Sequence, residues 1–145
     1  MINTEKIEEA KKAIKREKKP VIVKAQSNDF NRRILEQANF DVLLSPESGS
    51  KKDTLRQIDS GLNEILVDIA KRKKISIGIN IHEIKLLEKK EKANRLAKIR
   101  QNLMLCKKAG VRILAINYKD KMGTQSILAT LGASTSQARE ATSFK

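Results

Sequence analysis

Hydrophobic residues follow two arrangements along this chain: short continuous runs, and longer stretches with the spacing of a helix face. Four runs rich in Val, Ile and Leu occupy residues 21–25, 41–45, 75–81 and 111–117. Runs of this length, bounded by Pro, Gly or polar clusters, are typical of buried β-strands. The sequence therefore predicts four strands, the second of which stops at Pro46 before a polar loop over residues 47–53 that we expect to be exposed.

Helix-like spacing separates these runs. Pro20 bars continuation of the first helix, and Gly110 ends the most basic one. Ser27 or Asn28 offers an N-cap to the second helix, and Asp59 or Ser60 offers one to the third. The predicted helices cover residues 3–18 (Ile7, Ala10, Ile14), 28–38 (Phe30, Ile34, Leu35, Ala38), 62–73 (Leu62, Ile65, Leu66, Ile69), 92–108 (Leu96, Ile99, Leu103, Cys106), 127–131 and 136–141.

Strands that alternate with helices predict an α/β fold of parallel βα units with right-handed crossovers. A length of 145 residues fits one domain, residues 1–145, with a substantial core. Parallel sheets place functional groups beyond the carboxyl ends of their strands, here residues 24–27, 45–47, 80–83 and 117–119. Any chemistry is expected there.

Positive charge is concentrated in one part of the chain. Residues 71–108 hold thirteen of the 31 Lys and Arg residues and only three Glu, a net charge of +10 out of the formal +14. Such density is typical of proteins that bind a polyanion, because neutralised phosphates release condensed counterions. Nucleic acid is therefore the first expected partner, although Lys-rich helices also serve solubility or stability at high temperature.

Catalytic groups are scarce. His82 is the only histidine, so neither a metal centre nor histidine-dependent nucleophilic catalysis finds enough partners, and Glu83 is interpreted as a helix-starting residue. Nucleotide-binding glycine motifs are missing, and Cys106 fits a buried thiol on a helix face. With no apolar run near the roughly 20 residues of a membrane span, we expect a cytoplasmic, soluble protein without catalytic, metal or cofactor sites of its own.

One motif points to a family. Within residues 58–70, Asp59, Ser60, Gly61, Leu62 and Asn63 open a helix, and this segment resembles the family of ribonuclease P protein component 3, the archaeal counterpart of the eukaryotic thirty-kilodalton subunit. The resemblance extends over residues 20–142. It includes an Asn-Arg pair at residues 31–32, a strand that ends at Pro46, the run ISIGINI, and the basic helix followed by VRILAIN.

This resemblance implies a fold similar to a TIM-type barrel, related to metal-dependent phosphoesterase barrels that have lost their chemistry. A complete barrel of eight strands takes about 250 residues, so we expect a trimmed or partly open version.

The resemblance also implies a role in ribonuclease P, the ribonucleoprotein that removes the 5′ leader from precursor tRNA. The RNA subunit would perform the Mg²⁺-dependent hydrolysis, and the polypeptide would support it while paired with protein component 2 as a heterodimer or heterotetramer, beside other ribonuclease P proteins. Two alternatives remain open: a generic basic RNA-binding module, and a degenerate phosphoesterase-like enzyme.

Candidate RNA contacts are arginines able to hold phosphates through two hydrogen bonds, and clustered lysines. On a helical wheel Lys98 and Lys108 lie away from the apolar stripe, whereas Arg95 and Arg100 flank it and can instead pair with carboxylates. For the family motif, capping and loop fixation are favoured over a direct role. The exposed side of the first helix, around Ile7 and Ile14, is a candidate protein-facing surface. The full set of candidate RNA contacts is Arg32, Arg33, Lys51, Lys52, Arg56, Arg95, Lys98, Arg100, Lys107 and Lys108.

Overall fold

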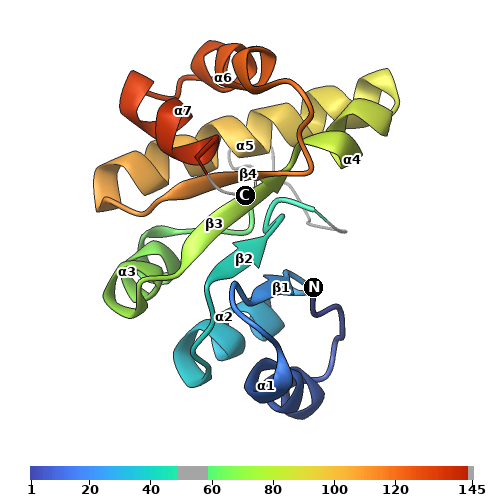
Figure 1. Cartoon of the computed structure of the whole chain (residues 1–145), viewed down its shortest axis with the longest axis vertical. Coiled ribbons are helices and arrows are strands. Elements are labelled where there is room, and N and C mark those ends of the chain that lie inside the picture. Colours follow the sequence, from blue (N-terminus) through green and yellow to red (C-terminus); the bar gives the residue numbers. More distant parts are fainter. Residues whose placement is uncertain (49–58, 144–145) are drawn as a thin grey trace.

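A computed structural model describes residues 1–48 and 59–143, which form an open, curved parallel sheet with its helices packed on one face. The four strands lie side by side in chain order, and every neighbouring pair is parallel (Figure 1). The strands are β1 (Ile22–Lys24), β2 (Val42–Leu44), β3 (Ser76–Asn80) and β4 (Ile113–Ile116). The predicted α/β class, with parallel βα units in a partly open arrangement, is confirmed.

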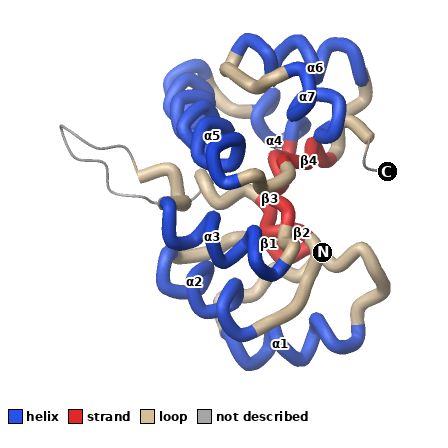
Figure 2. Tube along the Cα trace, turned by 90° about the vertical axis from the view of Figure 1, so that its left-hand side faces the viewer, coloured by secondary structure: helices blue, strands red, loops and turns tan. Residues whose placement is uncertain are grey.

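The described helices pack on the same face of the sheet. Each of them contributes buried residues to one core cluster, and in Figure 2 they follow the curve of the sheet from α1 through α2, α3 and α5 to α6 and α7. The helices are α1 (Ile7–Arg16), α2 (Asn28–Gln37), α3 (Glu64–Lys73), α4 (Ile81–Leu86), α5 (Lys89–Ala109), α6 (Lys121–Thr130) and α7 (Thr135–Ala141).

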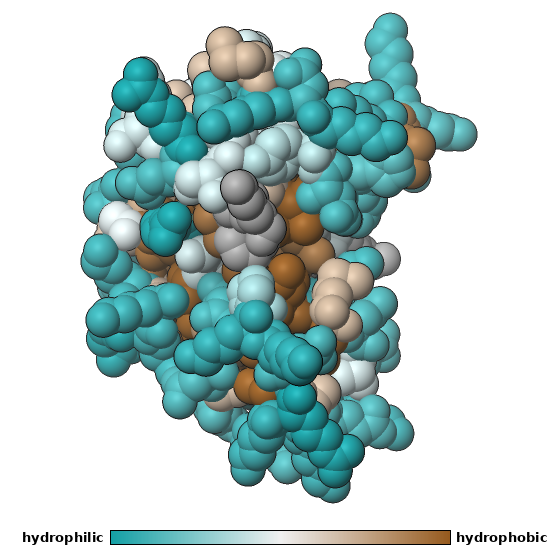
Figure 3. Space-filling model, viewed as in Figure 1, coloured by the Kyte–Doolittle hydropathy of each residue, from teal (hydrophilic) through white to brown (hydrophobic). Residues whose placement is uncertain are grey.

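Alternation along the strands produces two apolar layers. One set of strand side chains, which includes Val23, Leu43, Ile77 and Ile113, belongs to the main core. Residues of opposite orientation, such as Val42, Leu44 and Leu114, are also buried but lie outside that core cluster. On this second face, hydrophobic atoms are visible mainly in the middle, with hydrophilic side chains around them (Figure 3). Burial on both faces explains why the strands appear as continuous apolar runs.

The helix that follows the family motif begins later than predicted. Asn63 caps α3, and Glu64 is its first residue, so neither Asp59 nor Ser60 is the cap. Leu62 therefore precedes the helix. The buried face of α3 is made by Leu66, Val67, Ile69 and Ala70, and Ile65 is 58% exposed. The prediction that Ile65 lies on the apolar stripe is wrong.

Three other expectations also change. Helix α5 begins at Lys89 instead of residue 92, and α6 begins well before residue 127. Ile7 and Ile14 are half-buried and pack against the core, which disfavours them as a protein-facing surface. In the described part of the chain, no helix has the length and apolar character that crossing a membrane requires.

Candidate functional site

The carboxyl ends of the strands meet at one edge of the sheet, where polar side chains start the next helices. Ser27 follows β1 and caps α2 by accepting a hydrogen bond from Phe30 N at 3.2 Å. Asn80 ends β3 and caps α4 in the same way, with Glu83 N at 3.1 Å. Ser45 follows β2 with a φ of 56° and is fully buried. Ser27 and Asn80 are therefore engaged in capping, whereas the buried Ser45 hydroxyl has no hydrogen-bond partner among the described residues.

Arg95 of α5 reaches this edge and joins two carboxylates. Its Nη2 lies 3.2 Å from Glu47 Oε1, and its Nη1 lies 3.0 Å from Glu83 Oε1. The Arg95 side chain is 12% exposed and that of Glu47 only 1%. Burial raises the pKa of the Glu47 carboxyl, and the charge of Arg95 opposes that rise. Arg95 thus pairs with carboxylates, which is one of the two roles predicted for it. The prediction that Glu47 is exposed at the start of the polar loop is wrong.

Arg95 belongs to a buried polar stripe of α5. Lys98 and Asn102 follow it at helical spacing and are each 3% exposed. Asn102 Nδ2 donates a hydrogen bond to Ser60 O at 3.0 Å, which ties α5 to the family motif. The expectation that Lys98 faces outward is therefore wrong, because this side of α5 is covered and does not face solvent. Lys98 is a poor candidate for a direct RNA contact.

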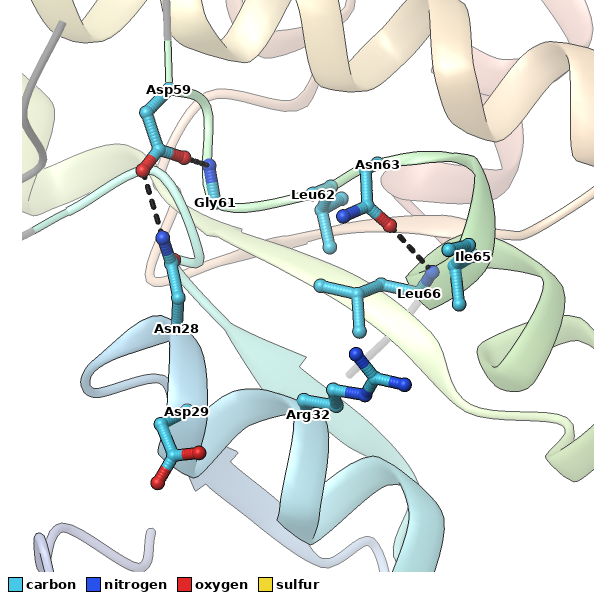
Figure 4. Close-up of a pocket in the computed structure, with 9 residues that line it drawn as sticks. All are labelled: Asn28, Asp29, Arg32, Asp59, Gly61, Leu62, Asn63, Ile65 and Leu66. Carbon is cyan, nitrogen blue, oxygen red and sulfur yellow. Dashed lines mark hydrogen bonds between the residues drawn. The ribbon is translucent and has the colours of Figure 1, made fainter.

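The family motif is a fixed turn between the sheet edge and α3. Asp59 accepts hydrogen bonds from Gly61 N at 2.9 Å and from Asn28 Nδ2 at 2.8 Å, and Asn63 Oδ1 accepts one from Leu66 N at 2.9 Å (Figure 4). Gly61 has a φ of 83°, and a Cβ there would overlap the carbonyl of Pro46. These contacts are those of capping and loop fixation, the role that the sequence favoured.

A pocket of about 320 Å³ lies beside this turn, between the first turns of α2 and α3. Its wall includes Asp29, Arg32 and Asp59, and the Arg32 guanidinium points toward Leu66 (Figure 4). Two carboxylates against one guanidinium give the pocket no excess of positive charge. Its electrostatics therefore disfavour a phosphate in this place.

The predicted contacts on α2 are exposed but paired. Arg32 Nε lies 3.0 Å from Glu36 Oε1, and Arg33 Nε lies 3.3 Å from Asp29 Oδ2. Pairs of this kind on a helix surface are weak, so either arginine can exchange its carboxylate for a phosphate.

The remaining candidates fall into two groups. Arg100, Lys107 and Lys108 are exposed on α5, and Lys108 Nζ lies 3.5 Å from Glu64 Oε1. The predicted contacts Lys51, Lys52 and Arg56 fall outside the described residues. The structure therefore leaves five described candidates on the surface, on two helices, and two in the buried stripe.

Groups for metal or nucleophilic chemistry do not converge at the sheet edge. Within residues 1–48 and 59–143, no three of His, Cys, Asp and Glu lie close enough to share a metal ion. The two carboxylates at the edge pair with Arg95, a donor set that does not fit a phosphoesterase metal centre. His82 is exposed on α4, and burial raises the pKa of the Cys106 thiol to about 12. Cys106 is the buried, inert thiol that its helical position predicted.

Sequence reasoning missed a set of cations at the opposite end of the sheet. Lys71, Lys74 and Arg112 are exposed where α3 and α5 end, and they line a second pocket of about 290 Å³. The signal in the sequence was the basic run at residues 71–74 immediately before a strand. The rule that parallel sheets carry functional groups at the carboxyl ends of their strands does not cover this end.

The comparisons with known proteins support the resemblance. The chain is 27% identical over 106 residues to ribonuclease P protein component 3 of Methanococcus vannielii, and 29% identical over 110 residues to that of Methanococcus maripaludis. These alignments cover 73% and 74% of this chain but only 43% and 44% of the relatives, so the chain spans less than half their length. No family model matches the chain.

The fold has a counterpart among solved structures. A chain in the cryo-EM structure of archaeal ribonuclease P with mature tRNA superimposes with a TM-score of 0.79 at 22% identity, over 98% of this chain and 62% of the other. At this identity the match concerns the fold, and it agrees with a partial TIM-barrel-like arrangement. The chain is thus similar in sequence to ribonuclease P protein component 3, as its Asp-Ser-Gly-Leu-Asn turn and the order of its strands and helices suggested.

Proposed function

We propose that this chain is a protein subunit of ribonuclease P and assists the removal of the 5′ leader from precursor tRNA. The observation that carries the proposal is the sequence similarity to component 3 over about three quarters of the chain. The matching fold of a chain in an archaeal ribonuclease P assembly supports it. In this role the protein works in the cytoplasm together with the ribonuclease P RNA, protein component 2 and other protein subunits.

The polypeptide acts on the RNA fold and leaves hydrolysis to the RNA subunit with its Mg²⁺. A formal charge of +14 allows the protein to reduce repulsion between phosphates where RNA helices pack. Arg95 offsets part of the negative charge of Glu47 and Glu83, which reduces their repulsion of the RNA. The active RNA fold then needs less Mg²⁺ in the presence of the protein.

Reconstitution tests this function. Ribonuclease P RNA, component 2 and this chain are combined with precursor tRNA, and leader removal is measured as Mg²⁺ is lowered. We expect cleavage to continue at Mg²⁺ concentrations where RNA with component 2 alone fails. Polylysine of equal total charge replaces the chain in a control, because nonspecific charge neutralisation should not reproduce the effect.

Two results would contradict the proposal. If the chain binds ribonuclease P RNA and unrelated RNAs equally and does not restore cleavage, it is a generic basic RNA-binding module. If the isolated chain hydrolyses a phosphodiester such as bis(p-nitrophenyl) phosphate and loses this activity with a chelator, the phosphoesterase alternative is correct.

A further inference from the structure

The pocket at the amino ends of β3 and β4 combines three basic side chains. Lys71 belongs to the last turn of α3, Lys74 follows that helix, and Arg112 directly precedes β4. The remaining wall consists of apolar residues, Ser76 and the backbone around Gly110, so no carboxylate lines the pocket. Its volume of about 290 Å³ is ample for a phosphate group with some of its water.

The basic groups at this pocket have few internal partners. Lys71 Nζ donates one hydrogen bond to Gly110 O at 3.0 Å, which fixes the ammonium at the rim and leaves two of its donors for other acceptors. Among the residues that the structure describes, Lys71 and Lys74 form no ion pair, and Arg112 Nε lies 3.8 Å from Glu140 Oε2 with both side chains more than half exposed. Such an exposed pair is weak and easily exchanged.

Helix-dipole compensation explains only part of this cluster. Cations at helix C-termini stabilise the partial negative charge of the last carbonyls, and α3 ends with Lys71, Arg72 and Lys73. Lys73 has a structural task, because its Nζ donates to Glu36 O at 3.1 Å and to Ala38 O at 2.7 Å. Lys74, the C-cap residue of α3, also lies close enough to serve this purpose, whereas Arg112 lies beyond the end of α5 and does not. Their convergence with Lys71 on one pocket requires another explanation.

An anion in the pocket provides that explanation. Three like charges around one cavity repel each other, and a phosphate among them removes the repulsion while accepting hydrogen bonds from all three side chains. Arg112 can hold two phosphate oxygens at once, and the lysines contribute point charges. We infer that this pocket binds a phosphodiester of an RNA backbone, so that RNA docks at the amino end of the sheet. The identity of the polyanion rests on the proposed function.

The first test uses inorganic phosphate as the probe, so it does not depend on ribonuclease P. Isotope-labelled protein is titrated with phosphate and, separately, with a short RNA duplex while backbone amide NMR signals are followed. We expect both probes to shift the amides of Ser76, Gly110, Val111 and Arg112. If neither probe shifts these signals, the pocket does not bind phosphate and the inference is wrong. If phosphate alone shifts them, RNA is the wrong occupant.

The second test compares two triple variants of equal charge. One replaces the pocket residues as Lys71→Gln, Lys74→Gln and Arg112→Gln. The matched control is Lys85→Gln, Lys89→Gln and Lys90→Gln, which removes three exposed lysines from α4 and the start of α5 in the same basic stretch. Thermal melting of both variants verifies that they are folded.

We expect the pocket variant to bind ribonuclease P RNA about 10- to 100-fold more weakly at physiological salt. The slope of log affinity against log salt should fall by about one for each phosphate that the variant no longer neutralises, and the control should change affinity by no more than about threefold. Equal losses in the two variants would overturn the inference. The proposed function fails separately: if reconstituted cleavage is not stimulated although the pocket binds RNA, the function is wrong and the binding site remains.

Discussion

The two ends of the parallel sheet differ in how their charged groups are partnered. At the carboxyl end Arg95 is 12% exposed and lies between Glu47 and Glu83, within 3.2 Å of both. At the amino end Lys71, Lys74 and Arg112 are exposed around a pocket without carboxylates. One end is therefore closed by internal ion pairs, and the other is open to an external anion.

This difference puts the pocket lined by unopposed cations at the end of the sheet opposite the usual location of function in parallel sheets. Active sites form at the carboxyl ends of strands because loops gather reactive side chains there. In this chain the loops gather an ion pair, caps and a turn fixed by Asp59 and Asn63. At the amino end the basic C-terminal ends of α3 and α5 lie close together, so electrostatics favour this end for RNA binding.

The largest effect is expected from Arg95→Met. Removal of the guanidinium leaves Glu47 buried without its compensating charge, which should lower the free energy of unfolding by about 3–5 kcal/mol. Because burial already raises the pKa of Glu47, the loss should shrink at acidic pH, where the carboxyl becomes protonated and neutral. Urea denaturation at two pH values measures both effects.

Lys85→Gln is the control for this prediction, since it removes an exposed charge from the neighbouring helix α4. If Arg95→Met lowers the free energy of unfolding by less than about 1 kcal/mol, this ion pair does not stabilise the carboxyl end of the sheet. The contrast between a closed end and an open end would then lose its basis.

Hydrophobic periodicity predicted the fold because burial on both faces of the sheet leaves continuous apolar runs. The same method failed where polar residues are buried. Lys98 occupies a covered side of α5, and a wheel that equates polar with exposed turns it outward. Ile65 shows the reverse error, since an apolar residue at helical spacing is 58% exposed. Whether such a residue is buried or exposed depends on its contacts with segments distant in the sequence, and local spacing does not reveal those contacts.

An intermediate effect is expected from Gly61→Ala. The alanine would sit at a positive φ and its Cβ would overlap the Pro46 carbonyl, so we expect a loss of about 3 kcal/mol in the free energy of unfolding. Gly132→Ala is the matched control, because Gly132 also has a positive φ of 105° but no atom lies within 4 Å of the position that its new methyl group would take.

Chemical denaturation of both variants isolates the steric part of this effect. Gly132→Ala should cost about 1–2 kcal/mol from backbone strain alone. Equal losses would indicate that the turn can move away from Pro46, and the carboxyl end would be less rigid than its hydrogen bonds imply.

The smallest effect on stability is expected from Glu140→Gln, which acts at the open end. Glu140 is the one carboxylate within 4 Å of Arg112 among the described residues, and both side chains are more than half exposed. The free energy of unfolding should therefore change by no more than about 0.5 kcal/mol. RNA affinity should nevertheless rise about two- to threefold, because Arg112 no longer has to leave the Glu140 carboxylate in order to bind a phosphate. Glu64→Gln, which frees Lys108 instead, is the control. A larger gain in RNA affinity from Glu64→Gln would move the docking surface from the pocket to the exposed side of α5.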